Sequence, residues 1–199
     1  MSKLDYQQAK FLLSVADLSQ LPPDKGVEVA IVGRSNAGKS SVLNQLTQNK
    51  KLARTSKTPG RTQFINLFSL DDNRRIADLP GYGYAKVSPA MKKRWQTLID
   101  GYLRDRECLK GLILVSDIRH PLKEFDQNIL AWSEQCGLAV HILLNKSDKL
   151  TQSAASASLR NVKNKLSLYS FSKLSIQTFS ALKGKGMKEL REQIDQWFF

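Results

Sequence analysis

The sequence predicts an α/β domain with a mostly parallel, twisted sheet of about six strands, one antiparallel hairpin at its edge and helices on both faces. Short apolar runs alternate along the chain with segments of helical periodicity, and a glycine-rich loop joins the first apolar run to a helix. Two strand-like segments are linked by only three residues. Alternation of strands and helices favours a parallel sheet, whereas so short a link requires antiparallel pairing.

The N-terminal half should contain the first strand and the hairpin. Residues 1–26 end in a stretch rich in proline and glycine, so we expect them to form an extension packed on the domain of residues 27–199. The apolar residues 29–32 predict a buried strand. Residues 64–70 and 74–78 should pair as the hairpin, with Asp71, Asp72 and Asn73 at its turn.

The C-terminal half continues the same alternation. We expect a helix from Ser88, a strand at 111–116, a helix at 122–136, a strand at 139–144, a helix at 151–168, a strand at 175–179 and a helix at 187–197. In the helix from Ser88, residues Met91, Trp95, Leu98, Ile99 and Tyr102 share one face and should pack in the core.

Length and composition indicate one domain. A chain of 199 residues suits a single α/β unit, and no stretch approaches the roughly 20 apolar residues that cross a bilayer. The N-terminal segment lacks the continuous apolar core of a signal peptide, which predicts a cytoplasmic protein without a membrane segment. No apolar heptad pattern is visible, so we expect a monomer. Cys108 and Cys136 lack metal-site spacing and should be buried free thiols.

Positive charge is concentrated in two segments of this chain, whose formal net charge is +13. Residues 29–70 contain seven Lys or Arg and residues 149–188 contain eight, and all 18 acidic residues lie elsewhere. Segregated positive charge is typical of a surface that meets a polyanion, of which nucleic acid is the commonest large one in the cytoplasm. A solvated basic face without a partner is the alternative.

Residues 33–40 read GRSNAGKS and match the phosphate-loop pattern G-x-x-x-x-G-K-[ST] between a strand and a helix. In this pattern the glycines let backbone N–H groups turn toward phosphate, the lysine reaches the outer phosphates and the final hydroxyl binds magnesium. The following helix points its positive end at the same phosphates. The nucleotide-binding candidates are Gly33, Arg34, Ser35, Asn36, Ala37, Gly38, Lys39 and Ser40.

A second pattern, D-x-x-G, closes the hairpin with Asp78, Leu79, Pro80 and Gly81. A carboxylate at the end of a strand can reach magnesium from the second shell or through a water, and the glycine N–H can meet the γ-phosphate. These four residues are therefore nucleotide-binding candidates.

Residues 55–64, TSKTPGRTQF, lie between the first helix and the second strand, where a loop that senses the γ-phosphate belongs. Its nucleotide-binding candidates are Gly60, Arg61, Thr62, Gln63 and Phe64. We favour Thr62 over Thr58 as the second hydroxyl ligand of magnesium, after Ser40. Lys39, Thr62 and Gly81 are the residues expected to act at the γ-phosphate during hydrolysis.

The pattern N-K-x-D after the strand at 139–144 selects the base. It comprises Asn145, Lys146, Ser147 and Asp148, and the Asp148 carboxylate can accept two hydrogen bonds from the guanine edge. Asn145 should brace the loop, and Lys146 should lie along the base. Phe179, Ser180 and Ala181 end the last strand and could supply backbone N–H groups to the guanine carbonyl. Small side chains there would permit the close approach.

Together these residues resemble the TRAFAC class of GTPases, and more closely the EngB (YihA/YsxC) family of ribosome-assembly GTPases. The resemblance rests on GRSNAGKSS at 33–41, KTPGRTQFIN at 57–66, DLPGYGYAKV at 78–87 and DIRHPL at 117–122, and it covers most of the chain. It implies a Ras-like P-loop fold, magnesium-dependent binding of GTP and GDP, hydrolysis of GTP, association with ribosomal RNA and large-subunit assembly particles, and a link to cell division and septation.

Some positions depart from Ras-like enzymes or invite further hypotheses. Tyr82 stands where a water-positioning glutamine would be, so intrinsic hydrolysis should be slow. Asn36 resembles the phosphate-loop asparagine of potassium-activated GTPases, which leaves K⁺ as an open option. Tyr82 and Tyr84 could stack on RNA bases or simply pack in the loop. His120 could act as a general base, but a structural role is commoner at such a position.

The leading functional hypothesis is a molecular switch whose GTP-ordered loops engage ribosomal RNA or protein. A division-linked protein-binding module with an indirect effect on ribosomes is the first alternative. A small-molecule phosphotransferase is the second, and N-K-x-D argues against it because such kinases rarely need to recognise guanine.

Overall fold

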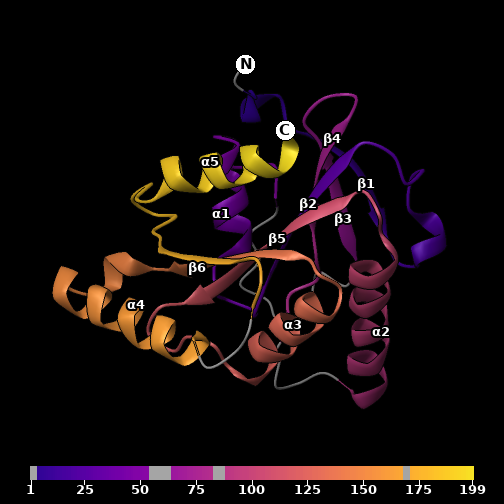
Figure 1. Cartoon of the computed structure of the whole chain (residues 1–199). Helices are drawn as coiled ribbons and strands as arrows, with labels where there is room; N and C mark the ends of the chain where they lie inside the picture. The colour runs from indigo at the N-terminus through magenta and orange to yellow at the C-terminus, as the bar shows by residue number, and fades with distance from the viewer. Residues whose placement is uncertain (1–3, 54–63, 83–87, 168–170) are drawn as a thin grey trace.

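The computed structural model shows a seven-stranded sheet between two layers of helices, and it describes residues 4–53, 64–82, 88–167 and 171–199 (Figure 1). The strands are β1 (Lys10–Val15), β2 (Val27–Gly33), β3 (Ile65–Ser69), β4 (Arg74–Asp78), β5 (Leu109–Asp117), β6 (Ala139–Asn145) and β7 (Leu174–Thr178). Their order across the sheet is β1-β3-β4-β2-β5-β6-β7. Neighbouring strands from β4 to β7 are parallel, and β3 is antiparallel to both of its neighbours. The predicted fold class is confirmed, with one strand more than expected.

The helices cover both faces of the sheet and bury one apolar side each. They are α1 (Lys39–Leu46), α2 (Pro89–Asp105), α3 (Glu124–Gln135), α4 (Gln152–Leu166) and α5 (Met187–Phe198). One core cluster joins α1 and α5 to the sheet, and a second joins α2, α3 and α4 to the opposite face (Figure 1). Trp95, Leu98, Ile99 and Tyr102 of α2 are buried as the helical periodicity predicts.

The additional strand comes from the N-terminal extension. β1 pairs antiparallel with β3, and its register shifts between Phe11 and Leu13. The sequence KFLLSV gives no clean alternation of apolar and polar residues, and four of its six residues are exposed, as suits an edge strand. The Tyr6 hydroxyl donates to Asp195 of α5 at 2.5 Å, so the extension contacts the C-terminal helix as well as β3.

A buried charge cluster fixes the end of β2 that lies opposite the phosphate loop. Glu28 is fully buried, and it accepts hydrogen bonds from Arg75 Nε at 2.7 Å, Arg106 Nη2 at 2.6 Å and the Tyr102 hydroxyl at 2.8 Å. Burial alone would raise the pKa of Glu28, but the hydrogen bonds from Arg106 and Tyr102 bring it below its ordinary value. The carboxylate thus stays charged and joins β2, β4 and α2.

The prediction that both thiols are buried is half wrong. Cys108 is buried, whereas Cys136 is exposed. Cys136 is the C-cap residue of α3, just beyond the last turn that packs on the sheet, so its side chain meets solvent.

Candidate nucleotide-binding site

The sequence motifs meet at one edge of the sheet. Gly33 ends β2, Asp78 ends β4 and Asn145 ends β6, and these three strands run in the same direction. The carboxyl ends of parallel strands form the edge where ligands bind in open α/β folds. Motifs that are up to 112 residues apart in sequence, from Gly33 to Asn145, therefore converge on one site.

The phosphate loop adopts the conformation that its glycines and Asn36 allow. Asn36 and Gly38 have φ angles of +63° and +98°, and the Ala37 N–H donates to Arg34 O at 3.0 Å. α1 begins directly after Gly38, so its first N–H groups and its positive dipole end adjoin the loop. Gly33 serves close packing instead, because an added Cβ would lie 2.5 Å from Val115 O.

Lys39 and Asp78 face each other behind the phosphate loop. The Lys39 ammonium is ion-paired with Asp78 Oδ1, and the two side chains are 9% and 5% exposed. Ser40, which follows Lys39 in the first turn of α1, is half-buried. The site therefore holds a cation, a carboxylate and a hydroxyl, which are the groups that a magnesium-bound triphosphate requires.

Asn145 joins the phosphate loop to the loop after β7. Its Nδ2 donates to Ala37 O at 2.8 Å, and its Oδ1 accepts from the Ala181 N–H at 3.1 Å. The side chain is buried, and a Cβ on Gly38 would lie 2.4 Å from its Nδ2. The bracing role assigned to this residue is therefore visible as two hydrogen bonds, and Gly38 has to be glycine to make room for it.

Lys146 lies between two acceptors, one of which the sequence reasoning missed. Its Nζ is 2.9 Å from Asp117 Oδ2 and also donates to Asn36 O of the phosphate loop. Asp117 holds Arg119 as well, at 2.7 Å. Although partial burial would raise the pKa of Asp117, the Arg119 and Lys146 cations hold it well below its usual range. Its position at the end of β5, the strand beside β6, was the signal that could have identified it.

Asp148 is oriented by the loop after β7. The Ser180 hydroxyl donates to Asp148 Oδ1 at 2.5 Å, and Ser180 is buried. The backbone N–H groups of Phe179, Ser180 and Ala181 donate to Leu144 O, Lys185 O and Asn145 Oδ1, respectively. Each of these N–H groups already has an acceptor, so it could bond the guanine carbonyl only by sharing its hydrogen. The Ser180 hydroxyl contributes more clearly, by orienting Asp148.

Tyr82 lies inside the protein. Its side chain is fully buried, and its hydroxyl donates to Asp126 of α3. The hypothesis that Tyr82 stacks on RNA bases is therefore wrong for this structure, and packing is the correct alternative. Tyr84 lies outside the described residues. His120 is exposed, and its backbone N–H donates to Asp117 O, which places it in a turn, and its role as a general base stays a hypothesis.

The loop predicted to sense the γ-phosphate lies largely outside the described residues. This applies to Thr58, Gly60, Arg61, Thr62 and Gln63, whereas Phe64 is described and is 43% exposed. Within the described ranges, no cluster of three or more His, Cys, Asp or Glu residues is arranged to hold a metal. In the same ranges, no helix combines the length and apolar character that a bilayer-spanning segment needs.

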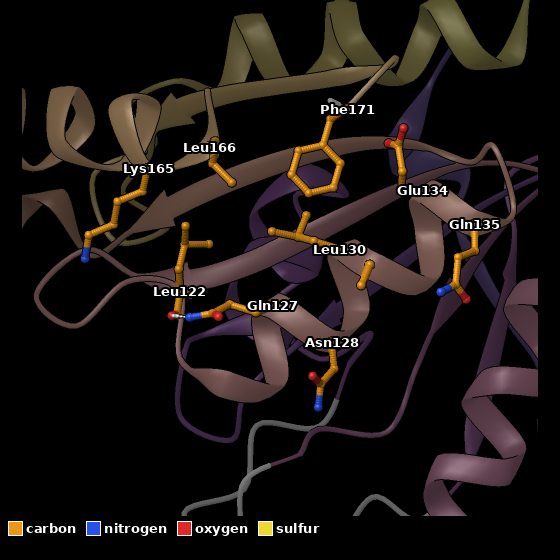
Figure 2. Close-up of a pocket in the computed structure, with 10 residues that line it drawn as sticks. Leu122, Gln127, Asn128, Leu130, Glu134, Gln135, Lys165, Leu166 and Phe171 are labelled. Atoms are coloured by element: carbon orange, nitrogen blue, oxygen red, sulfur yellow. Dashed lines mark hydrogen bonds between the residues drawn. The ribbon is translucent and has the colours of Figure 1, made fainter. Parts of the chain in front are cut away.

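A separate cavity of about 620 Å³ lies between α3, α4 and the segment before β7 (Figure 2). Leu122, Leu130, Leu166 and Phe171 make its lining largely apolar, and Gln127 Nε2 donates to Leu122 O at 3.0 Å. The lining contains no residue of the phosphate loop, D-x-x-G or N-K-x-D. Its largely apolar chemistry does not suit a triphosphate.

Known proteins resemble this chain over almost its full length. The sequence model of the family described as "50S ribosome-binding GTPase" matches residues 28–146. The "Probable GTP-binding protein EngB" of Coxiella burnetii (strain RSA 331 / Henzerling II) is 54% identical over 193 residues, which cover 97% of this chain and 94% of the relative. The protein of the same name from Escherichia coli O9:H4 (strain HS) is 50% identical over 198 residues, which cover 100% and 94%.

Solved structures share the fold. The crystal structure of a probable GTP-binding protein engB superposes with a TM-score of 0.70 at 21% identity, and the match covers 86% of this chain and 98% of that one. Era in complex with MgGDPNP and nucleotides 1506-1542 of 16S ribosomal RNA gives a TM-score of 0.66 at 23% identity, with 87% and 57% covered. The family match agrees with the phosphate loop, D-x-x-G and N-K-x-D lying at one edge of the sheet. The chain belongs to the EngB family of GTP-binding proteins, and it is a GTPase.

Proposed function

We propose that this GTPase is a cytoplasmic, magnesium-dependent molecular switch that acts in assembly of the large ribosomal subunit and is needed for normal cell division and septation. The observation that carries the switch is the contact between D-x-x-G and the phosphate loop. A Cβ added to Gly81 would lie 3.6 Å from Gly33 O, and the Ser35 N–H donates to Tyr82 O at 2.7 Å. A γ-phosphate bound in the loop would therefore meet Gly81 directly.

The residues at the strand ends fit a magnesium-bound guanine nucleotide. Lys39 would leave Asp78 for the outer phosphates, and Asp78 would then hold magnesium through a water, with Ser40 and Thr62 as its hydroxyl ligands. The Lys39–Asp78 ion pair would thus be replaced by a Lys39–phosphate pair and an Asp78–magnesium pair, so neither buried charge would lack a partner. Asp148 would bind guanine while Lys146 covers the base. Magnesium supplies neutralisation of the phosphate charge, and the protein supplies orientation.

Hydrolysis should be slow in the isolated protein. Tyr82, in the position of a water-orienting glutamine, is buried against α3 and offers no group to the attacking water. Lys39, Thr62 and Gly81 remain to stabilise the γ-phosphate. Turnover measured in sodium and in potassium buffers tests both this expectation and the option that Asn36 supports a K⁺ ion. Rapid turnover of the protein alone in sodium buffer would overturn the slow-switch proposal.

Ribosomal RNA fits the charge distribution of the surface. On α4, Arg160, Lys163 and Lys165 are exposed, and after β7 so are Lys183 and Lys185. These residues belong to a segment that contains no acid. The family description "50S ribosome-binding GTPase" supports the large subunit as the particle. Each phosphate contact releases counterions, so binding should weaken steeply as salt is raised.

Co-sedimentation with large-subunit precursor particles tests the proposal. The protein should sediment with the particles in the presence of a non-hydrolysable GTP analogue and remain in the supernatant with GDP, and raising salt from 50 to 200 mM should reverse the association. Crosslinking would then identify the RNA. Equal sedimentation with GDP and with the analogue would contradict a switch. Loss of GTP only when a small acceptor other than water is added would favour a phosphotransferase instead.

A further inference from the structure

Tyr82 connects the D-x-x-G loop to α3 through its side chain. The residue directly follows Gly81, and its ring packs on Phe125 with 4.3 Å between ring centroids. Its hydroxyl donates to Asp126 Oδ1. Phe125 and Asp126 both belong to the first turn of α3.

Asp126 is a fixed acceptor for this hydroxyl. The residue is 1% exposed, and its Oδ2 accepts from Ser116 Oγ at 3.0 Å and from the Lys123 N–H at 3.1 Å. Burial raises the pKa of Asp126, against the effect of these donors. All three donors come from different parts of the chain, namely β5, the start of α3 and the D-x-x-G loop. The carboxyl group therefore cannot turn away from Tyr82 without breaking the N-terminal cap of α3.

The backbone of Tyr82 is joined to the phosphate loop at the same time. Its carbonyl accepts the Ser35 N–H at 2.7 Å, and it forms a parallel bridge with Arg34. Gly81, the residue before Tyr82, lies close to Gly33 and Ser35. One residue thus links α3 to the loop that holds the phosphates.

We propose that Asp126 is a positioning residue for the nucleotide cycle. By anchoring Tyr82 in the core it keeps Gly81 beside the phosphate loop, ready to receive a γ-phosphate. This inference rests on the proposed function, in which the Gly81 N–H meets that phosphate. Without the anchor, Gly81 must be ordered each time GTP binds, and this cost lowers the apparent affinity for GTP. GDP has no γ-phosphate, so its affinity does not include that cost.

Equilibrium binding of a non-hydrolysable GTP analogue and of GDP tests the anchor. The variants are Tyr82→Phe, which removes only the hydroxyl, Asp126→Ala, and the double variant. The ratio of analogue affinity to GDP affinity should fall about tenfold in each, roughly the effect of one hydrogen bond to a charged group. The double variant should be no worse than Asp126→Ala, because both changes break the same contact. If Asp126→Ala does not fold, Tyr82→Phe carries the test by itself, because it removes only the hydroxyl of the same contact.

Tyr102→Phe is the matched control. The Tyr102 hydroxyl also donates to a buried carboxylate, Glu28 Oε2 at 2.8 Å, but at the opposite end of the sheet. This variant should lose thermal stability to a similar extent as Tyr82→Phe and keep the wild-type affinity ratio. Ser133→Ala, which removes a buried hydroxyl that donates to Ile129 O at 2.8 Å in α3, should keep that ratio too.

Gly81→Pro separates the two proposals, because proline lacks the backbone N–H that would meet the γ-phosphate. If Gly81→Pro lowers the affinity ratio while Tyr82→Phe leaves it unchanged, the anchor is overturned and the γ-phosphate role of Gly81 survives. If Gly81→Pro also leaves the ratio unchanged, that role is overturned, and the anchor falls with it. If Tyr82→Phe and Asp126→Ala weaken the analogue and GDP equally, the contact is merely structural and the inference is wrong.

Discussion

Lys39 and Asp78 form an ion pair in the interior of the protein, although each is expected to act on a different part of the bound nucleotide. Lys39 starts α1 and Asp78 ends β4, so the pair joins the phosphate loop to D-x-x-G. Binding of a magnesium nucleotide would exchange this contact for one between lysine and phosphate and one between carboxylate and metal. The Lys39–Asp78 pair would therefore stabilise the site when it is empty and be replaced by contacts with the nucleotide and metal when it is filled.

Asp78→Asn should reduce both the stability of the nucleotide-free protein and the effect of magnesium on GDP affinity. Lys39 would be left as a buried, unpaired cation, which we expect to cost about 3 kcal/mol in the free energy of unfolding without nucleotide. Magnesium should increase GDP affinity in the wild type and do so far less in the variant. Thermal unfolding and GDP titrations with and without magnesium measure these effects. Asp71→Asn, which removes a solvent-exposed partner of Arg74, is the control and should change neither. A full magnesium effect in Asp78→Asn would contradict the assigned role.

Asp148→Asn should change the preferred base from guanine to xanthine. The carboxylate accepts from two guanine donors, whereas an amide offers one donor and one acceptor, which match the ring N–H and the additional carbonyl of xanthine. GTP affinity should fall about a hundredfold or more, and XTP affinity should rise above it. Competition between GTP and XTP for the phosphate site measures the exchange. Unchanged preference for GTP would mean that another residue reads the base.

Asn145→Ala should weaken GTP and GDP by a similar factor, about a hundredfold. The change removes both hydrogen bonds between the phosphate loop and the loop after β7 and leaves Ala37 O and the Ala181 N–H without their partner. Asn44→Ala provides a comparison, since Asn44 is a buried asparagine that bonds Lys50 O and both backbone groups of Ala53 at the far end of α1. It should reduce stability with little effect on affinity. A selective loss of GTP binding in Asn145→Ala would point to a γ-phosphate role instead.

His141 should make stability fall as pH is lowered through the ordinary histidine pKa of about 6.5. The ring is buried between Ser175 Oγ at 2.7 Å and Gln177 Oε1 at 2.8 Å. Burial lowers the pKa of His141. The unfolded chain therefore takes up a proton first, so this stabilisation is complete above the ordinary value of about 6.5 and is lost as pH falls toward the folded-state pKa.

Thermal unfolding of His141→Gln at pH values above and below about 6.5 checks the assignment. Its stability should change less with pH than that of the wild type, by up to about 1.4 kcal/mol for each unit by which the pKa is lowered. His120→Gln changes an exposed histidine and should retain the wild-type profile. Identical profiles for the wild type and His141→Gln would rule out His141 as the titrating group.

Local sequence patterns located most of the site because a parallel sheet places the ends of its strands together. Gly33, Asp78 and Asn145 are recognisable from the few residues around them, and strand polarity alone brings them to one edge. By contrast, β1 was not predicted, because KFLLSV has no strand periodicity and becomes a strand only by pairing with β3. Asp117 was missed for a similar reason, since its contact with Lys146 joins neighbouring strands.

The sequence by itself thus determined the fold class and located the phosphate-loop and N-K-x-D motifs, because each depends on short-range spacing and on apolar periodicity. Only the tertiary structure decided which charges pair and where a side chain points. Lys39 turns to Asp78, and Tyr82 turns inward to Asp126, 44 residues further along the chain. Such contacts depend on how helices pack across the sheet. Because the whole core sets that packing, no local sequence pattern predicts it.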